Sequence, residues 1–271
     1  MVSNLLEADI ETVLDAAFAG GDEELFVVDP AGETIVSLIE VAVDREDLPQ
    51  LSMLVDERTI KNVMDDFLIA SKAADLVANG SLDLRLLPRA VDNALFVSPS
   101  RVFVLVSTDD RVAALSTEDG DFVSDVFETN RTAFETAETY GLRTPAISRI
   151  RETMAAEIGA ETRDDFDAVL SAMESTHDSG GGLDEVTVSL LVAAKNDVLL
   201  YDISKWGEDV GIASKATFSR TKTRLEDLGI IDTEKVPIDV GRPRLRLKLG
   251  DERLHGVDAA ELADVAIDLM T

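Results

Sequence analysis

The sequence predicts a protein of two parts: an α/β domain whose sheet is flanked by helices, followed by a winged helix-turn-helix domain. Three observations lead to this prediction. Short apolar runs closed by turn residues alternate with helical patterns in the first part of the chain, as they do in α/β sheets. Three closely spaced helical patterns and a strand pair follow a glycine-rich stretch. Positive charge gathers on these last elements, in a chain of 271 residues with a formal net charge of −29.

The first part contains the strand signals. The runs "ELFVVDP" (24–30) and "LSMLVDE" (51–57) are short, apolar and bounded by acidic or turn residues, which predicts buried strands. Apolar residues at spacings of three and four predict one helix over residues 57–79, before the strand "SLDLRLLP" (81–88). Residues 94–117 predict three further strands joined by Ser-Pro and Asp-Asp turns. We therefore expect a sheet that is parallel at first and antiparallel toward one edge.

Helical patterns fill the rest of the first part. Gly141, Pro145 and Gly159 divide residues 119–174 into three helical segments. The stretch "STHDSGGGLDE" (175–185) then combines three consecutive glycines with polar residues, which is typical of a linker. The expected domains are an α/β dimerisation or effector domain (1–174), a glycine-rich linker (175–183), a winged helix-turn-helix domain (184–250) and a C-terminal helix (251–271).

Three helical patterns between residues 186 and 232, with the turn "VGIAS" before the third, have the spacing of a helix-turn-helix. Ser214 is placed to cap the third helix. Spacing at 100° per residue turns Phe218, Thr221, Leu225 and Leu228 toward the core. Trp206 in the second helix is also expected in the core. The outer face and its flanks are expected to contact DNA through Ser214, Lys215, Ala216, Thr217, Ser219, Arg220, Lys222, Thr223 and Arg224.

The stretch "IIDTEKVPIDVGRPRLRLKLG" (230–250) predicts a strand pair, the wing. In its second strand the cations alternate with leucines, so that the period of two places on one face Arg242, Arg244, Arg246 and Lys248. We expect this face to contact the DNA backbone, although cations on an edge strand also serve to block aggregation. The hypothesis requires that these cations are not turned inward or bound to carboxylates of their own chain.

The charge of the chain is uneven. Residues 213–249 hold nine basic against five acidic side chains, whereas the whole chain holds 25 against 54. An acidic surface of this kind suits molar salt, where the Debye length falls to about 3 Å and like charges are screened. We expect a halophilic source, with an acidic nucleic-acid mimic as the alternative. The absence of cysteine, of a signal peptide and of long apolar runs indicates a cytoplasmic protein that does not enter the membrane.

The residues from "ISKWGEDVGIASKATFSR" through the wing resemble the winged helix of archaeal transcription regulators, and "DERTIKNVMDDFLIASKAADLVANGSLDLRLLP" resembles the companion domain of TrmB-related haloarchaeal regulators. The whole chain resembles the haloarchaeal TbsP-like family. This resemblance implies a sequence-specific regulator of central carbon metabolism genes that forms a homodimer and binds promoter DNA. It also implies a degenerate phospholipase-D-like fold in the N-terminal part.

No enzyme motif accompanies this fold. A phospholipase-D-like enzyme needs a histidine motif, and neither His177 nor His255 lies in one. We expect no catalytic residue, cofactor or metal site. The N-terminal domain is expected to serve as a dimerisation platform or, alternatively, to bind a small anionic metabolite through Arg85 and Arg89.

Two other functions stay open: a phospholipase-D-like enzyme with a nucleic-acid-binding appendage, and an adaptor whose basic wing binds an acidic protein. The C-terminal helix is expected either to pack on its own chain or to pair with another subunit.

Overall fold

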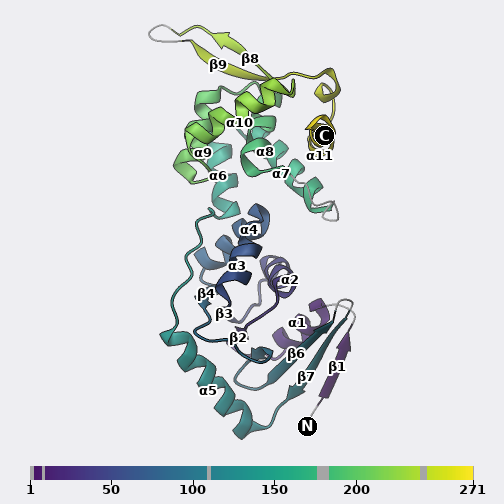
Figure 1. Ribbon diagram of the computed structural model, residues 1–271, viewed down its shortest axis with the longest axis vertical. Coiled ribbons are helices and arrows are strands. Elements are labelled where there is room, and N and C mark those ends of the chain that lie inside the picture. The colour runs from purple at the N-terminus through teal and green to yellow at the C-terminus, as the bar shows by residue number, and fades with distance from the viewer. Residues whose placement is uncertain (1–2, 8–9, 109–110, 176–182, 239–242, 271) are drawn as a thin grey trace. The chain divides into compact units, whose positions relative to one another are not determined.

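The computed structural model describes residues 3–7, 10–108, 111–175, 183–238 and 243–270 (Figure 1). Contacts divide the chain into two compact units, Met1–Leu142 and Arg143–Thr271. This division lies upstream of the linker expected at 175–183, most of which falls outside the described residues. The two helices between residues 143 and 175 pack with the C-terminal elements, so they belong to the second unit and not to the α/β domain as expected.

The N-terminal unit is built on a seven-stranded sheet in the order β1-β7-β6-β5-β2-β3-β4. Its strands are β1 (Ser3–Glu7), β2 (Glu24–Val28), β3 (Gln50–Val55), β4 (Leu82–Leu86), β5 (Ala94–Val97), β6 (Val102–Thr108) and β7 (Arg111–Thr117). β2, β3 and β4 are parallel and the other pairings are antiparallel, which confirms the expected mixed sheet. β1 pairs with β7 and has no counterpart among the expected strands.

Helices cover the two faces of the sheet unequally (Figure 1). One face packs against α1 (Ile10–Phe18), α2 (Gly32–Val43), α3 (Glu57–Met64) and α4 (Phe67–Ala78), and the other against α5 (Gly120–Thr136). The strand period of two divides β2 between these cores, since Leu25 and Val27 face the first and Phe26 the second. On the α5 side the ring of Phe26 meets the rings of Phe127 and Phe134 edge-on, with centroids 5.2 and 5.7 Å apart.

The helix expected over residues 57–79 is two helices, α3 and α4. The carboxylate of Asp56 accepts hydrogen bonds from the backbone N–H groups of Arg58 and Thr59, at 2.9 and 3.0 Å, and thereby starts α3. Asp66 does the same for α4 by accepting from the Ile69 N–H at 3.1 Å. A second N-cap inside one apolar pattern therefore breaks a helix that periodicity alone predicts to be continuous.

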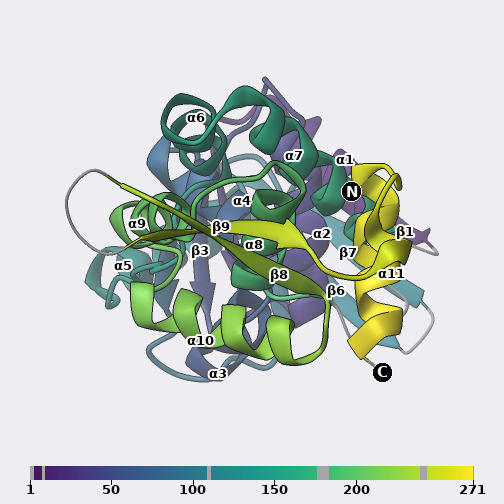
Figure 2. The ribbon, with the colours of Figure 1, turned by 90° about the horizontal axis from the view of Figure 1, so that it is seen from above.

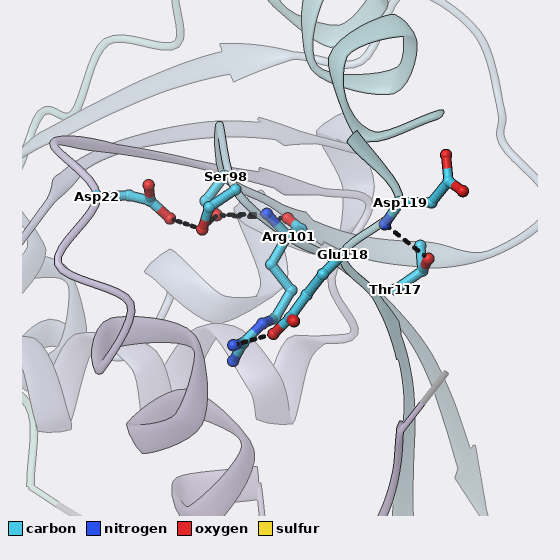
Figure 3. Close-up of polar contacts among 7 residues, drawn as sticks. Asp22, Ser98, Arg101, Thr117, Glu118 and Asp119 are labelled. Atoms are coloured by element: carbon cyan, nitrogen blue, oxygen red, sulfur yellow. Dashed lines mark hydrogen bonds and ion pairs between the residues drawn. The ribbon is translucent and has the colours of Figure 1, made fainter. Parts of the chain in front are cut away.

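The start of α5 is fixed by polar contacts at the end of the sheet where β5 turns into β6 (Figure 3). Ser100 donates its hydroxyl hydrogen to the carboxylate of Asp22 at 2.6 Å, and the guanidinium of Arg101 forms an ion pair with Glu118. The next residue, Asp119, caps the first turn of α5. These bonds hold the turn, the entry to β2 and the start of α5 together.

The C-terminal unit is mainly helical. Its helices are α6 (Ile147–Glu157), α7 (Ala160–Ser175), α8 (Glu185–Lys195), α9 (Leu200–Val210), α10 (Lys215–Asp227), the 3-10 helix η1 (Glu252–Leu254) and α11 (Ala259–Met270), and its strands are β8 (Ile231–Val236) and β9 (Arg244–Leu249). The helices and the antiparallel strand pair expected between residues 184 and 250 are confirmed. α8 lies at the centre of the unit, and the residues from Val186 to Ala194 are all buried.

The expectation that Trp206 lies in this core is confirmed, and of the two placements expected for the C-terminal helix the structure shows packing on its own chain. Trp206 is buried, and its indole N–H donates to the hydroxyl of Thr153 at 3.0 Å. α11 packs on α7 of the same chain and buries Leu262, Ala263 and Ala266. Within the described part of the chain, no helix is both long enough and apolar enough to cross a lipid bilayer.

Candidate nucleic-acid interface

The turn between α9 and α10 has the geometry of a helix-turn-helix. α9 ends at Gly211, whose φ of 101° lies in the left-handed region that favours glycine. The backbone N–H groups of Gly211 and Ile212 both donate to the carbonyl of Gly207, at 3.2 and 2.8 Å. The next helix begins after Ser214, whose hydroxyl oxygen accepts from the Thr217 N–H at 3.2 Å. Ser214 is therefore the N-cap that the sequence predicts.

The packing of α10 fixes which of its faces is exposed. Phe218 and Leu225 are fully buried, as expected. The ring of Phe218 lies against Gly207 of α9 so closely that a Cβ atom there would come within 2.4 Å of it. Thr221 is half-buried. The prediction for Leu228 is wrong: its side chain is 44% exposed, because α10 ends at Asp227 and the chain turns away.

Most of the expected DNA-facing residues of α10 are exposed, and Figure 2 shows this helix beside the β8–β9 strand pair. The exposed ones are Ser214, Lys215, Ala216, Ser219, Arg220, Thr223 and Arg224. Thr217 is half-buried beside the N-cap. The side chain of Lys222 is only 12% exposed and forms an ion pair with Glu226 at 2.6 Å. Because Glu226 also accepts from the Thr233 hydroxyl at 2.7 Å, Lys222 helps to hold β8 against α10 and does not lie open at the flank of the helix as expected.

Lys215, at the start of α10, also has a partner. Its ammonium group forms an ion pair with Glu208 of α9, and its backbone N–H donates to the same carboxylate at 3.3 Å. The hydrogen bond from Lys215 lowers the pKa of Glu208, and the same bond raises the pKa of Lys215. The pair is therefore fully charged at neutral pH and links the two helices of the helix-turn-helix.

Arg220 and Arg224 differ from these lysines. Arg220 is exposed, and its Nε–H donates to the carbonyl of Ala216 one turn earlier at 3.4 Å. Within the described part of the chain it forms no ion pair with a carboxylate. The guanidinium of Arg224 donates to the hydroxyl of Thr187 in α8 at 3.4 Å. The exposed surface of α10 thus presents two arginines, Arg220 and Arg224, whose charges no described acidic side chain neutralises.

The cations of the wing alternate with leucines as predicted, and Leu247 is buried in the opposite face of β9. However, they are not free of carboxylates. Each described cation forms an ion pair within its own chain: Arg244 with Asp202 at 3.3 Å, Arg246 with Glu234 at 3.6 Å and Lys248 with Asp197 at 2.6 Å. The side chain of Arg244 also lies over the ring of Tyr201, 4.2 Å from its centroid. Arg242 lies outside the described residues.

The requirement that the wing cations be free is therefore not met on β9. The three side chains remain 37–39% exposed, so they are paired at the surface and not turned into the core. Exposed ion pairs of this kind contribute only about 0–1 kcal/mol and can be exchanged for other anions. The free positive charge of the described interface lies on α10 and not on the basic face of β9.

Lys235 is a further exposed cation of the interface that the sequence patterns did not single out. Lys235 of β8 is exposed and forms no ion pair with any residue that the structure describes. It shares the parity of Ile231, which is buried, and of Thr233, which bonds to α10 through Glu226. The period of two in "IDTEK" places Lys235 on the α10 side of the wing. This alternation could have identified Lys235 from the sequence, but it is less regular than the alternation of arginine and leucine in β9.

The two arginines considered for an effector have different surroundings. Arg85 donates to the Phe134 carbonyl at 2.8 Å, pairs with Asp83 at 3.3 Å and lies over the Phe134 ring, so it fastens β4 to the end of α5. Arg89 instead lines a cavity between the sheet and α5. The carboxylate of Asp29, at the end of β2, has a raised pKa, mainly because it is partly buried and also because Asp56 lies near.

His255 is exposed after η1, and His177 falls outside the described residues. Among the residues that the structure describes, no group of three or more histidine, cysteine, aspartate or glutamate side chains is arranged to hold a metal ion.

Comparisons with solved structures return proteins that share little sequence with this chain. TrmBL2, described as an archaeal chromatin protein with a novel mode of DNA binding, is 21% identical over 51% of this chain, with a TM-score of 0.38, and this chain covers 54% of it. The phospholipase D family member Nuc from Salmonella typhimurium (11% identity) and NucT from Helicobacter pylori (10%) each align with 52% of this chain and 99% of their own, with TM-scores of 0.37. Similarity at these scores carries no argument about function.

Family comparisons are more decisive. A search of curated proteins finds no significant match. Two family models do match: "Transcriptional regulator TbsP-like, N-terminal" over residues 2–145, and "Transcriptional regulator TbsP-like, C-terminal HTH domain" over residues 146–267. Their boundary agrees with the division of the chain after Leu142. Together they span almost the whole sequence, and the chain therefore belongs to the TbsP-like family of transcriptional regulators.

Proposed function

We propose that this protein regulates transcription by binding double-stranded promoter DNA in a sequence-specific manner, with α10 in the major groove. The observation that supports this most is the exposed face of α10, where small and hydroxyl-bearing residues surround Arg220. Small side chains let a helix come close to base edges, and an arginine without a carboxylate partner can donate two hydrogen bonds to guanine. Ser219 and Thr223 lie on the same face and supply hydroxyl groups for further base or phosphate contacts.

The distribution of free and paired cations supports different proposed roles for these side chains. Arg220 is the proposed reader of sequence, and Arg224 and Lys235, which pair with no described carboxylate, are the proposed phosphate contacts around it. Lys215 and the cations of β9 would reach phosphates only by leaving their carboxylates, so their contribution is proposed to be secondary. Arg242, which lies outside the described residues, remains a proposed backbone contact. A chain with a net charge of −29 repels DNA over most of its surface, which restricts productive encounters to this region.

The biological setting is proposed from the family resemblance and the composition. The resemblance implies control of central carbon metabolism genes in a halophilic archaeon, and the excess of acidic over basic residues supports a high-salt cytoplasm.

The protein is also proposed to act as a homodimer. Val106 and Leu115 are 50% and 46% exposed on adjacent strands of the sheet, on the face that α5 leaves partly open. Apolar side chains exposed in this way suit contact with a second copy of the chain, and dimers read palindromic operators.

Neither alternative function gains support from the structure. The sequence lacks the histidine motif that an enzyme related to phospholipase D needs. An adaptor that binds an acidic protein through the basic face of β9 would need free cations on that face, and the described cations of β9 are paired. A phosphodiesterase assay tests the first alternative directly.

The proposal is tested by genome-wide immunoprecipitation of the tagged protein from cells grown on two carbon sources. The wild-type protein is expected to occupy discrete promoters of carbon metabolism genes. Arg220→Ala is expected to lose these sites, whereas Arg149→Ala, a matched change at an exposed arginine of α6, is expected to keep them. Retention of the same promoters by Arg220→Ala would show that α10 does not read the operator.

A further inference from the structure

A cavity in the N-terminal unit lies between the sheet and α5. Its volume is about 440 Å³, which is within the range of small-molecule sites, about 300–1,000 Å³. Val28 and Leu54, at the carboxyl ends of the parallel strands β2 and β3, form part of its wall. Ligands of open α/β sheets characteristically bind at this end of the strands. The segment from Leu87 to Val91, which follows β4, and one face of α5 complete the cavity.

The walls of the cavity are predominantly apolar. Leu87, Leu95 and Val126 line it together with the strand ends. Two more lining residues are unusually open for their type, since Phe122 is 54% and Val91 is 36% exposed. A ligand with an apolar body that covered these two side chains would remove their apolar surface from water, which favours binding. A sugar-like ligand, with hydroxyl groups on all sides, would find few hydrogen-bond partners on these walls.

The polar groups of the cavity define the charge of the ligand. Among the described residues that line it, Arg89 is the one cation, and it forms no ion pair with any described carboxylate. The hydroxyl of Thr129 and the amide N–H of Asn130 are occupied by backbone carbonyls of α5, at 2.7 and 2.8 Å, which leaves mainly acceptor capacity on these side chains. Asp125 also lines the cavity and disfavours a second negative charge on the ligand.

We propose that this cavity binds a small monocarboxylate with an apolar body, whose carboxylate pairs with Arg89. The planar guanidinium of an arginine matches a carboxylate in a two-point hydrogen bond. A single cation, in a cavity that Asp125 also lines, suits one negative charge better than the two of a phosphate. The ligand would join the segment after β4 to α5. That it acts as the effector of the regulator rests on the proposed function, but its binding does not.

The proposal is tested by calorimetric titration of the full-length protein with octanoate, octan-1-ol and acetate. Octanoate carries both the apolar body and the charge, octan-1-ol only the body and acetate only the charge. Octanoate is expected to bind saturably, acetate not to bind, and octan-1-ol to bind at least about tenfold more weakly than octanoate. Equal binding of octanoate and octan-1-ol, or no saturable binding of octanoate, overturns the proposal.

Three variants of lining residues test the site. Arg89→Gln is expected to weaken octanoate binding about tenfold, while Arg58→Gln, at an exposed arginine of α3 that does not line the cavity, leaves it unchanged. Val126→Trp, which fills the cavity, is expected to abolish binding, with thermal unfolding used to confirm that the variant is folded. If Arg89→Gln binds octanoate as the wild type does, the assignment of Arg89 is wrong.

Phe122→Ser distinguishes a ligand site from a subunit interface. If this variant changes the oligomeric mass and leaves octanoate affinity unchanged, the exposed apolar surface around Phe122 is a subunit interface and the proposal fails.

Operator affinity is measured separately, with and without octanoate. If the wild-type protein binds the operator but not octanoate, only the ligand-site proposal is contradicted. If it binds octanoate but no operator, only the proposed function is contradicted.

Discussion

At the scale of single residues, the availability of a cation depends on its carboxylate neighbours more than on its place in a pattern. Acidic side chains outnumber basic ones 54 to 25 in this chain, so most cations are expected to have a partner. Arg244 and Arg220 both lie where a winged helix meets DNA, but only Arg244 pairs with a described carboxylate. The alternation of arginine and leucine in β9 predicts a shared face but not the acidic partners. Asp197 and Asp202 come from outside the strand pair, and Glu234 faces Arg246 only through the register of β8 and β9.

This difference leads to a prediction for Asp202. Asp202→Asn removes the partner of Arg244 and leaves its guanidinium free to contact phosphate. Binding to unrelated duplex DNA is expected to strengthen, and the slope of log affinity against log salt to become steeper by about one unit. The measurement is fluorescence anisotropy across a series of salt concentrations. Asp264→Asn, an exposed change on α11, serves as the control for loss of one negative charge; if both variants give the wild-type slope, Arg244 does not reach the backbone even when freed.

At the scale of elements, the helix-turn-helix depends on the close approach of α9 and α10. Gly207 allows the ring of Phe218 to lie against the α9 backbone, and a methyl group at position 207 would overlap that ring. Both residues lie inside helices, so the requirement for glycine comes from packing and not from backbone conformation.

Gly207→Ala is therefore expected to destabilise the protein even though alanine favours helix formation. Overpacking of this kind costs about 1–3 kcal/mol, which exceeds the gain of about 1 kcal/mol in helix propensity. The free energy of unfolding, measured by chemical denaturation in high salt, is expected to fall. Gly120→Ala is the matched control, because no atom lies within 4 Å of the added Cβ and position 120 begins α5. A Gly207→Ala protein as stable as the wild type would mean that α10 is not held against α9 in this way.

Local patterns predicted the elements better than their connections. The strands that became β2 to β7 and the helices α8 to α10 follow from apolar periodicity and turn residues, which act over a few positions. The break at Asp66 was missed because a capping carboxylate replaces backbone bonds without interrupting the apolar spacing. The division after Leu142 was missed because it depends on which core α6 and α7 join, and the glycines at 180–182 gave a stronger local signal.

The candidate interface shows the same limit. The N-cap Ser214 and the core position of Phe218 are local properties and were predicted. The burial of Lys222 was not, because it depends on Glu226 also bonding to Thr233 in the next element. The cavity beside α5 is formed by segments that are far apart in sequence, and only its position near the strand ends could be anticipated.

At the scale of the whole molecule, the chain combines two compact units in one acidic protein. The N-terminal unit supplies the proposed ligand cavity and subunit contact, and the C-terminal unit supplies the helix-turn-helix. The net charge of −29 opposes the approach of a duplex to most of the surface, and the proposed contact lies in the small region around α10. In molar salt the release of counterions contributes less to affinity, so specificity is proposed to come from direct contacts of α10 with DNA.

The absence of native cysteines allows this central claim to be tested directly. Ser219→Cys on the exposed face of α10 and Glu161→Cys on α7 can each be labelled with an iron chelate that cleaves nearby DNA. With the operator bound, cleavage from position 219 is expected at a few adjacent base pairs within the site, and none from position 161. Binding that persists without localised cleavage from position 219 would contradict the placement of α10 in the major groove.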